Sequence, residues 1–200
     1  MRSSFGSKSI LEWLIEVVLI GVGVFLGLLA NQWHDDRQHR QLADATLRYF
    51  HEEILVNKQA IEKVRPYHAA LSQEVGSFLQ GEGPKTTDRF QSNVHFRGVK
   101  PVEFERTAWD LALATQSFSY LPPKLAYAIS RVYTRQQAFQ TLQNGFLQAV
   151  LAPTTYGAPD MTGFATSMNM YLLDVNIQEP QLITLYDQVL PQIDAATPKQ

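Results

Sequence analysis

One stretch near the N-terminus limits what this chain can be. From Val17 to Ala30 the sequence has no polar side chain, and Trp13 and Trp33 bracket the stretch. At 1.5 Å per helical residue the two tryptophans lie about 30 Å apart, which is the thickness of a bilayer's hydrocarbon core. Tryptophan at both ends is typical of a membrane interface. The sequence therefore predicts a transmembrane helix over 10–33, with Trp13 and Trp33 as membrane-interface anchors.

Three other interpretations of this stretch fit the sequence less well. A buried helix of a soluble protein usually keeps a polar side. A cleaved signal peptide ends in small residues of an A-x-A-like pattern, whereas Leu28-Leu29-Ala30 is bulky there. A helix lying flat in the interface needs a charged face. We expect a retained anchor that crosses the membrane once, because no second apolar run of this length follows.

One face of the predicted span gathers glycine and acidic residues. At about 100° per residue, Glu16, Gly23 and Gly27 fall on the same side of the helix. Gly23 and Gly27 form a small-xxx-small pattern, which lets two helix backbones approach closely. Glu16 lies about one turn inside Trp13, where a carboxylate is costly unless it is neutral, paired or in reach of the headgroups. The face predicts contact with a second copy or with another membrane protein; the alternative is the ordinary glycine content of membrane helices.

The charges that flank the span bear on its orientation. Arg2 and Lys8 precede it, whereas Arg37, Arg40 and Arg48 follow it, so the count does not favour an inside N-terminus. A short tail ahead of a first span often stays inside, and a chain without Cys tolerates an oxidising compartment. We expect the N-terminus inside and the bulk of the chain outside.

Helical periodicity continues beyond the span. Apolar residues recur at three-, four- and seven-residue steps from Leu47 to Val64, and Pro66 predicts a helix end or a kink. A second helix is expected over 66–80, stopped by the Gly81-Glu82-Gly83-Pro84 sequence. Residues 81–106 are expected to be irregular, with at most a brief extended piece.

The second half of the chain predicts further helices. Thr107-x-x-Asp110 has the spacing of a capping box, and Pro123 is well placed to begin the following helix, whose apolar period runs to Val150. After a loop at 153–159, Asp160 is expected to cap a helix, and Glu179-Pro180 to open the last one.

These segments predict an all-α protein in which the transmembrane helix continues as a stalk into an extramembrane helical bundle. The apolar content of 45% and the charged content of 18% are those of a folded chain. The expected divisions are an N-terminal tail at 1–9, the transmembrane helix at 10–33, a juxtamembrane helical stalk at 34–46, the bundle at 47–194 and a frayed tail at 195–200.

The sequence contains no catalytic constellation. A net charge of −2 argues against a nucleic-acid partner, and the absence of Cys excludes thiolate chemistry. His34 and His39 are five residues apart, so they diverge on a helix and do not form a metal-binding pair. We predict no catalytic residue, no metal and no cofactor.

A resemblance adds to this description. The sequence Leu28-Leu29-Ala30-Asn31-Gln32-Trp33-His34-Asp35-Asp36, which follows the aliphatic run, resembles the start of a family of bacterial single-pass membrane proteins of unknown function. Residues 106–110 and 125–133 are similar to that family's helical body, whereas Gln32 and His34 depart from its usual Asn-Asn-Trp-Asn-like ending. The resemblance implies a membrane anchor followed by a helical domain, and it carries no catalytic residues.

These observations together predict a membrane-anchored interaction module, such as a scaffold, an accessory subunit or a sensor-like protein. Its expected partners are the bilayer and a protein at the glycine face, and its expected location is the bacterial inner membrane with the bulk periplasmic. Two alternatives stay open. One is a membrane-tethered enzyme in which at least two of His51, His68, His95 and Glu103 converge in a concave pocket. The other is a ligand-sensing bundle, with a pocket lined by aromatic residues of 109–139.

Overall fold

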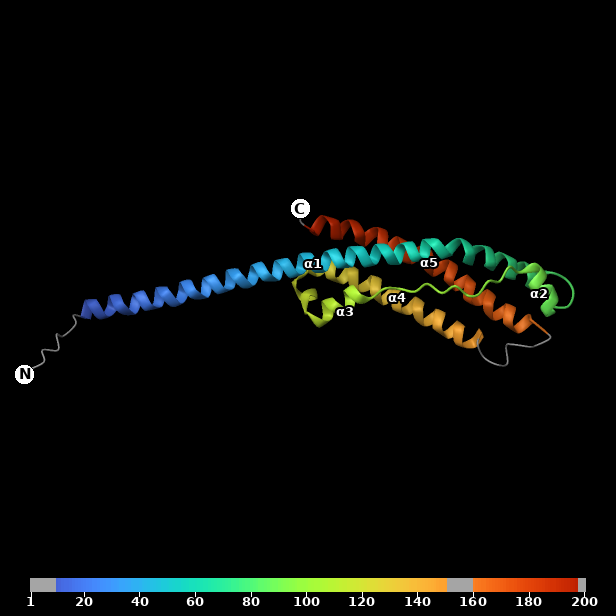
Figure 1. The fold of residues 1–200 in the computed structure, drawn as a ribbon, viewed down its shortest axis with the longest axis horizontal. Helices are drawn as coiled ribbons and strands as arrows, with labels where there is room; N and C mark the ends of the chain where they lie inside the picture. The colour runs from blue at the N-terminus through green and yellow to red at the C-terminus, as the bar shows by residue number, and fades with distance from the viewer. Residues whose placement is uncertain (1–9, 151–159, 198–200) are drawn as a thin grey trace, which may run out of the picture.

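The computed structural model describes residues 10–150 and 160–197, with side chains from residue 13 onward. This part of the chain contains five α-helices, one 3₁₀-helix and no β-strand, so the all-α prediction is confirmed. The predicted tail at 1–9, the predicted loop at 153–159 and the last three residues lie outside the described residues. The elements, shown in Figure 1, are α1 (Ile10–Gln80), α2 (Thr87–Asn93), α3 (Thr107–Ala114), η1 (Ser117–Tyr120), α4 (Pro123–Val150) and α5 (Thr162–Ala196).

α1 is a single helix of 71 residues, about 105 Å long at 1.5 Å per residue. Its first part projects from the domain as a rod, and its second part packs along the other helices (Figure 1). The predicted helix end at Pro66 is wrong, because Pro66 lies inside the helix with its ring exposed to solvent. Ile61 and His68 are fully buried on either side of it, and their packing outweighs the one hydrogen bond that proline removes.

α5 also runs through prolines. Pro180 and Pro191 both lie inside it, so the predicted opening of a new helix at Glu179-Pro180 is wrong. Glu179 and Leu182 are fully buried next to Pro180, so the segment is held by the neighbouring helices. Tertiary packing therefore decides helix continuity at these positions, against the local preference of proline.

The domain is a bundle of three long helices around one hydrophobic core. α4 runs in the same direction as the packed part of α1, and α5 runs in the opposite direction to both (Figure 1). The most extensive packing joins α1 to α5, and α4 also packs along α5. The largest fully buried apolar side chains come from all three helices: Phe50, Ile54, Ile61, Ile129, Phe139, Met168, Leu172, Leu182, Tyr186 and Ile193.

The far end of the bundle is closed by short elements. α1 ends at Gln80, ahead of Gly81–Pro84, as predicted. The short helix α2 was not predicted; seven residues are too few to show a helical period. It is capped at Thr86, whose Oγ1 accepts the N–H of Arg89 at 3.4 Å. Its Phe90 ring packs edge-on against Phe78 and Phe164.

Residues 94–106 form an extended segment that pairs with no strand in the described chain. Two buried amide side chains replace a partner strand. Asn57 on α1 accepts the N–H of Glu105 and donates to its carbonyl, both at 2.8 Å. Gln143 on α4 does the same for Val102, at 2.6 Å and 3.0 Å. The segment therefore follows the groove between α1 and α4 because side chains satisfy its backbone groups.

The start of α3 differs from the prediction, although the helix itself is confirmed. The N-cap position belongs to Arg106, so Thr107 and Asp110 do not form a capping box. Glu53 on α1 takes the role instead, because its Oε2 accepts the N–H of Ala108 at 2.7 Å. A carboxylate near a helix N-terminus is favourable, here supplied from 55 residues away in the sequence.

The predicted starts of the two remaining long helices agree with the structure to within one residue. α4 begins at Pro123, as predicted. At α5 the N-cap position belongs to Met161, one residue after the predicted Asp160. Asp160 still serves this end of the helix, because its Oδ1 accepts from the backbone N–H and the hydroxyl of Thr162, at 2.9 Å and 2.6 Å. These two hydrogen bonds lower the pKa of Asp160.

Candidate functional site

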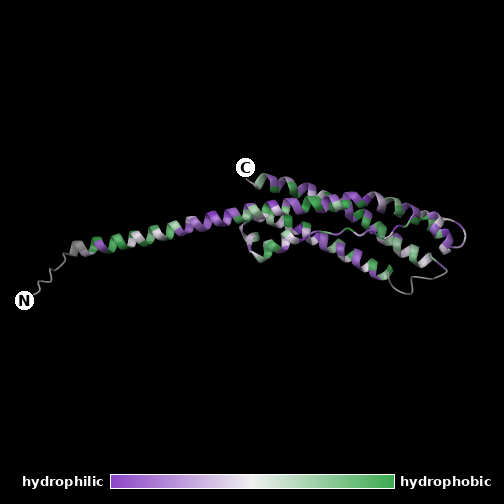
Figure 2. Ribbon diagram, in the orientation of Figure 1, coloured by the Kyte–Doolittle hydropathy of each residue, from purple (hydrophilic) through white to green (hydrophobic). Residues whose placement is uncertain are grey.

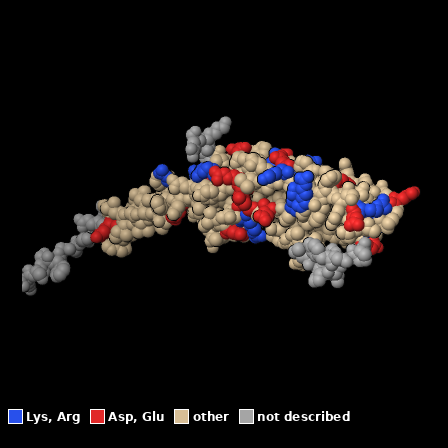
Figure 3. Space-filling view, turned by 45° about the vertical axis from the view of Figure 1, so that its right-hand side comes forward, with Lys and Arg blue, Asp and Glu red and all other residues tan. Residues whose placement is uncertain are grey.

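The projecting part of α1 is the candidate membrane anchor. The apolar window of this helix is not buried against any part of the described chain, and the helix is long and apolar enough to cross a membrane. Figure 2 shows the apolar residues at the free end of α1, followed by a hydrophilic stretch before the domain. Trp13 and Trp33, the two predicted interface anchors, are both exposed on this rod. In Figure 3 the Lys, Arg, Asp and Glu atoms lie mostly over the domain.

The predicted interaction face, formed by Gly23 and Gly27 with Glu16, lies on this rod, and its two glycines are not covered by other described residues. A Cβ atom added at Gly23 or at Gly27 would meet no atom within 4 Å. Gly21, on another side of the helix, is equally open. Glu16 lies on the same helix, within the apolar window. Nothing in the described domain therefore covers the glycine face.

The continuity of α1 fixes where this face points relative to the domain. Phe50 and Ile54 follow Gly23 and Gly27 by 27 residues each, which is about 7.5 turns at 3.6 residues per turn. Phe50 and Ile54 are fully buried against the rest of the bundle. On one continuous helix, half a turn of offset places the glycines on the side opposite the domain.

The stalk at 34–46 joins the rod to the domain, and its last residues already pack against the domain, since Ala43 and Thr46 are buried. The Arg37 guanidinium lies 5.9 Å from the Trp33 ring centroid, and the Asn31 amide donates to Asp35 at 3.1 Å. The His39 ring stacks on Tyr120 at the end of η1, with centroids 4.0 Å apart and planes 14° apart. This stacked pair brings η1 against the stalk.

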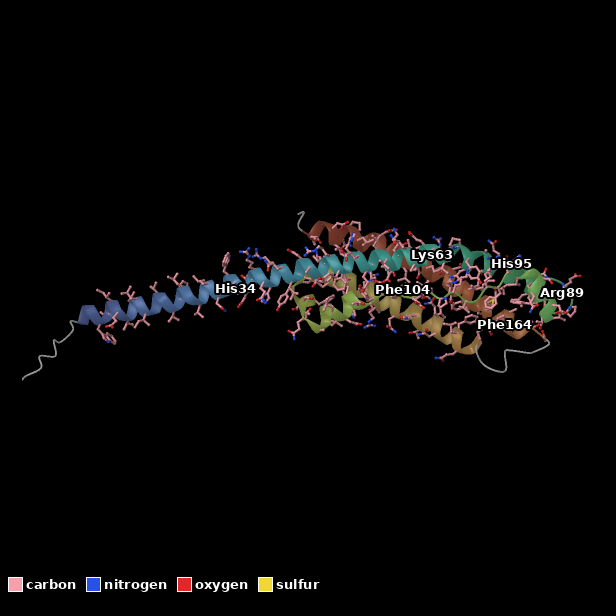
Figure 4. The ribbon with its side chains drawn as sticks, in the orientation of Figure 1. His34, Lys63, Arg89, His95, Phe104 and Phe164 are labelled. Atoms are coloured by element: carbon pink, nitrogen blue, oxygen red, sulfur yellow. The ribbon has the colours of Figure 1, made fainter. Side chains whose placement is uncertain are left out.

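The histidines named in the enzyme alternative do not meet. Each has its own carboxylate partner: His51 with Asp194 at 3.2 Å, His68 with Glu179 at 2.6 Å, and His95 with Glu74 at 2.9 Å. Figure 4 shows His95 toward the far end of the domain and His34 on the rod. Glu103, the carboxylate named with them, is exposed.

The sequence did not reveal a set of buried polar residues that joins the helices. Glu53, Asn57, His68, Gln143 and Glu179 are all buried, and each bonds to a distant segment. One signal was available for α1. Asn57 and His68 occupy positions that continue the three- and four-residue spacing of its apolar residues, so extending the period to polar residues would have found them.

Most of the aromatic residues considered for a pocket form core. Trp109 stacks on Tyr133 at 4.8 Å and lies edge-on to Phe118 at 5.3 Å. The Tyr133 hydroxyl donates to Glu53 Oε1 at 2.6 Å, which supplies the polar partner that a buried tyrosine needs. Tyr127 differs, because it is exposed and lines a shallow groove of about 640 Å³ between α4 and α5.

Comparison with known proteins gives no assignment. No protein family model, no curated protein and no solved structure gives a significant match to this chain. The resemblance to the bacterial single-pass family stays a prediction.

Proposed function

We propose that this chain is a single-pass protein of the bacterial inner membrane that acts as an interaction module. In this proposal the projecting part of α1 is the anchor, and the bundle is the part that projects from the membrane. The chain brings no catalytic group to this role. It holds a folded domain at a set height above the bilayer and offers surfaces to partners.

The observation that carries the proposal is the unbroken course of α1 from the apolar rod into the core. A flexible linker would let a domain rotate freely above its anchor. A continuous helix transmits both distance and rotation, because each residue advances it by 1.5 Å and 100°. The side of the anchor that meets a partner therefore sets the direction in which the domain faces.

The partner surface in the membrane is the face of Gly23 and Gly27, with Glu16 on the same side. Helices associate in lipid through close packing and hydrogen bonding, and small residues permit that approach. The domain lies on the opposite side of α1, so two anchors can meet along their glycines without collision of their domains. A second copy is the simplest partner, and another membrane protein is the alternative.

The proposed orientation places the bundle in the periplasm. The short N-terminal tail then stays inside, and the chain's lack of Cys suits an oxidising compartment. Alkaline phosphatase fused to the C-terminus is expected to be active. Fluorescence from a reporter that matures only in the cytosol would reverse the orientation and leave the anchor in place.

The anchor itself is tested by charge. Replacing Val22 and Phe25 together with Lys costs about 2.5–3.5 kcal/mol of insertion free energy per residue near the span centre. The double variant is expected to leave the membrane fraction or to be degraded. Complete retention in the membrane after a carbonate wash would contradict a transmembrane anchor.

The glycine face is tested by a bulky side chain. Gly27→Ile is expected to weaken association of the span in an in-membrane two-hybrid assay, because the branched side chain holds the backbones apart. Gly21→Ile is the matched control, since Gly21 lies about 160° around the helix from Gly23. Equal signals for the wild type and both variants would contradict the glycine interface, and the bundle would become the place to look for a partner.

One observation keeps the ligand-sensing alternative in view. The groove between α4 and α5 is lined by Arg131 and Arg135, one turn apart on α4, and by no carboxylate. Such a surface suits an anionic ligand. The groove is shallow, whereas ligand pockets usually enclose most of a small molecule, so we favour the interaction role over ligand sensing.

A further inference from the structure

The end of the domain nearest the anchor carries apolar side chains. α3 and η1 form a lobe over residues 107–120 at this end, beside α1 where the rod enters the domain (Figure 1). The exposed fractions of Leu111, Leu113 and Tyr120 are 44%, 51% and 39%. From Leu111 to Pro123 the sequence has no charged residue. From Leu111 onward the exposed surface of this lobe is therefore apolar or neutral, whereas Asp110, near its start, is exposed and forms an ion pair with Arg106.

The height of the lobe above the anchor follows from α1. Tyr120 stacks on His39, and His39 follows Trp33 by six residues of unbroken helix, which is about 9 Å. When Trp33 marks the edge of the hydrocarbon core, the headgroup layer covers about 5–7 Å of that distance. A helix tilt of about 20° toward the side of the lobe would lower the lobe by roughly 3 Å for every 10 Å from the helix axis. The Tyr120 end of the lobe therefore lies near the outer surface of the headgroups, whereas Phe118 and Ala108, which contact Phe50 and Glu53, lie about 25 Å and 30 Å beyond Trp33 along α1.

The other side of the anchor is where a protein partner fits. Tyr120, Phe118 and Ala108 all contact α1 on its domain side, through His39, Phe50 and Glu53. The glycine face points the opposite way, by the half-turn offset given above. The membrane surface beneath the lobe is accordingly lipid and not the partner helix.

From this geometry we propose that the α3–η1 lobe docks on the lipid headgroups of the same membrane that α1 crosses. Tyrosine and leucine side chains gain by leaving water for the interfacial layer, where an aromatic ring with a polar tip is favoured. Lys124, exposed just beyond the lobe, is placed to meet lipid phosphates. The contact would give the domain two attachments to the bilayer, the anchor and the lobe, and so fix its tilt. The inference rests on the proposed membrane anchor.

The test uses the full chain in phosphatidylcholine vesicles, with lipids that carry a nitroxide quencher on the headgroup or on the acyl chain. The chain has no Cys, so one introduced thiol carries one fluorophore. Leu113→Cys places the label on the lobe. Ile177→Cys is the matched control, because Ile177 is as exposed, at 57%, but lies on α5 away from the lobe. Phe25→Cys places the label in the span and reports on the anchor.

The expected result is loss of fluorescence from the label at position 113 with the headgroup quencher, and none from the label at 177. The label at 25 is expected to be quenched from the acyl chains. Equal signals at 113 and 177, with 25 quenched, would overturn the docking of the lobe and leave the anchor intact. An unquenched label at 25 would overturn the anchor and the docking together.

A second variant tests the geometry without changing the lobe. Seven helical residues inserted after Asp36 lengthen the stalk by about 10 Å and restore nearly the same rotation. Quenching at position 113 is then expected to fall to the level of 177, while quenching at 25 is unchanged. Persistent quenching at 113 in the lengthened chain would overturn the proposed height of the lobe.

Discussion

His68 on α1 and Glu179 on α5 form a fully buried pair, with 2.6 Å between Nδ1 and Oε1. The other ring nitrogen, Nε2, lies 3.0 Å from the carbonyl oxygen of Val99. A carbonyl only accepts hydrogen bonds, so Nε2 carries a proton. The pair therefore joins three segments: the two long helices and the extended stretch at 94–106. His68 follows Pro66 by two residues and Glu179 directly precedes Pro180, so the pair lies close to two of the prolines inside these helices.

Removal of the carboxyl group at Glu179 tests this connection. Glu179→Leu leaves Nδ1 of His68 buried without a partner and is expected to cost about 3 kcal/mol of unfolding free energy. Glu179→Gln is expected to cost about 1 kcal/mol, because the amide can donate to Nδ1. Urea denaturation of the full chain in detergent, followed by near-UV circular dichroism, measures both. Equal losses for the two variants would show that the volume at this position matters and the hydrogen bond does not.

Pro66 offers a test of helix continuity. Because its ring is exposed, Pro66→Ala removes no core contact and restores one backbone hydrogen bond. The expected gain in unfolding free energy is about 2 kcal/mol, since proline inside a helix costs about 3 kcal/mol relative to alanine. Gln59→Ala, also at an exposed position of α1, is the control and is expected to change little. A loss of stability in Pro66→Ala would mean that the bundle needs a bend at this point.

Three buried tyrosines predict instability at high pH. Burial, the largest cause, raises the pKa of Tyr133, Tyr171 and Tyr186 above the ordinary value of 10. Each contributes stability that is fully present below pH 10 and is lost as the pH rises further, because the unfolded chain then releases protons that the folded chain keeps. Tyrosinate absorbance and loss of helical signal are expected to rise together in an alkaline titration.

Two phenylalanine variants separate the tyrosines. The Tyr171 hydroxyl has no hydrogen-bond partner among the described residues, so Tyr171→Phe is expected to cost little and to reduce the alkaline loss. Tyr133→Phe leaves Glu53 Oε1 without its donor and is expected to cost about 1–3 kcal/mol at neutral pH. The opposite ranking in urea denaturation would contradict these assignments.

The hydrogen bonds of the Glu74 carboxylate predict a loss of folding stability at low pH. It accepts the backbone N–H of His95 at 2.7 Å, and this hydrogen bond, with the facing imidazole at 2.9 Å, lowers the pKa of Glu74 below its ordinary 4.5. Its contribution to stability is present above pH 4.5 and is lost as the pH falls through the lowered value. Glu74→Gln is expected to flatten the decline in stability between pH 5 and 3, and Glu103→Gln, at an exposed site, is expected to leave it unchanged. Parallel declines in wild type and Glu74→Gln would contradict the role of this carboxylate.

The sequence by itself determined the features that depend on neighbours along the chain. The stretch from Trp13 to Trp33, which contains the apolar run at 17–30, is long enough for a membrane span whatever the rest of the chain does. The spacing of Leu47, Phe50 and Ile54 specified one buried face of α1, and Gly81 to Pro84 specified its end, because backbone conformation at glycine and proline is a local property. The start of α4 at Pro123 has the same origin.

Tertiary structure decided what depends on residues far apart in the sequence. Pro66 and Pro180 favour helix ends locally, yet α1 and α5 continue because the side chains around both prolines are buried in the core. The path of residues 94–106 could not be predicted from the sequence, because it depends on hydrogen bonds such as that between Asn57 and Glu105, which are 48 residues apart. His68 and Glu179, 111 residues apart, meet only after the bundle has formed. The hydrogen bond between two such groups stabilises the protein only when packing brings them together and excludes water. Its free energy is therefore a property of the assembled fold and not of any one segment.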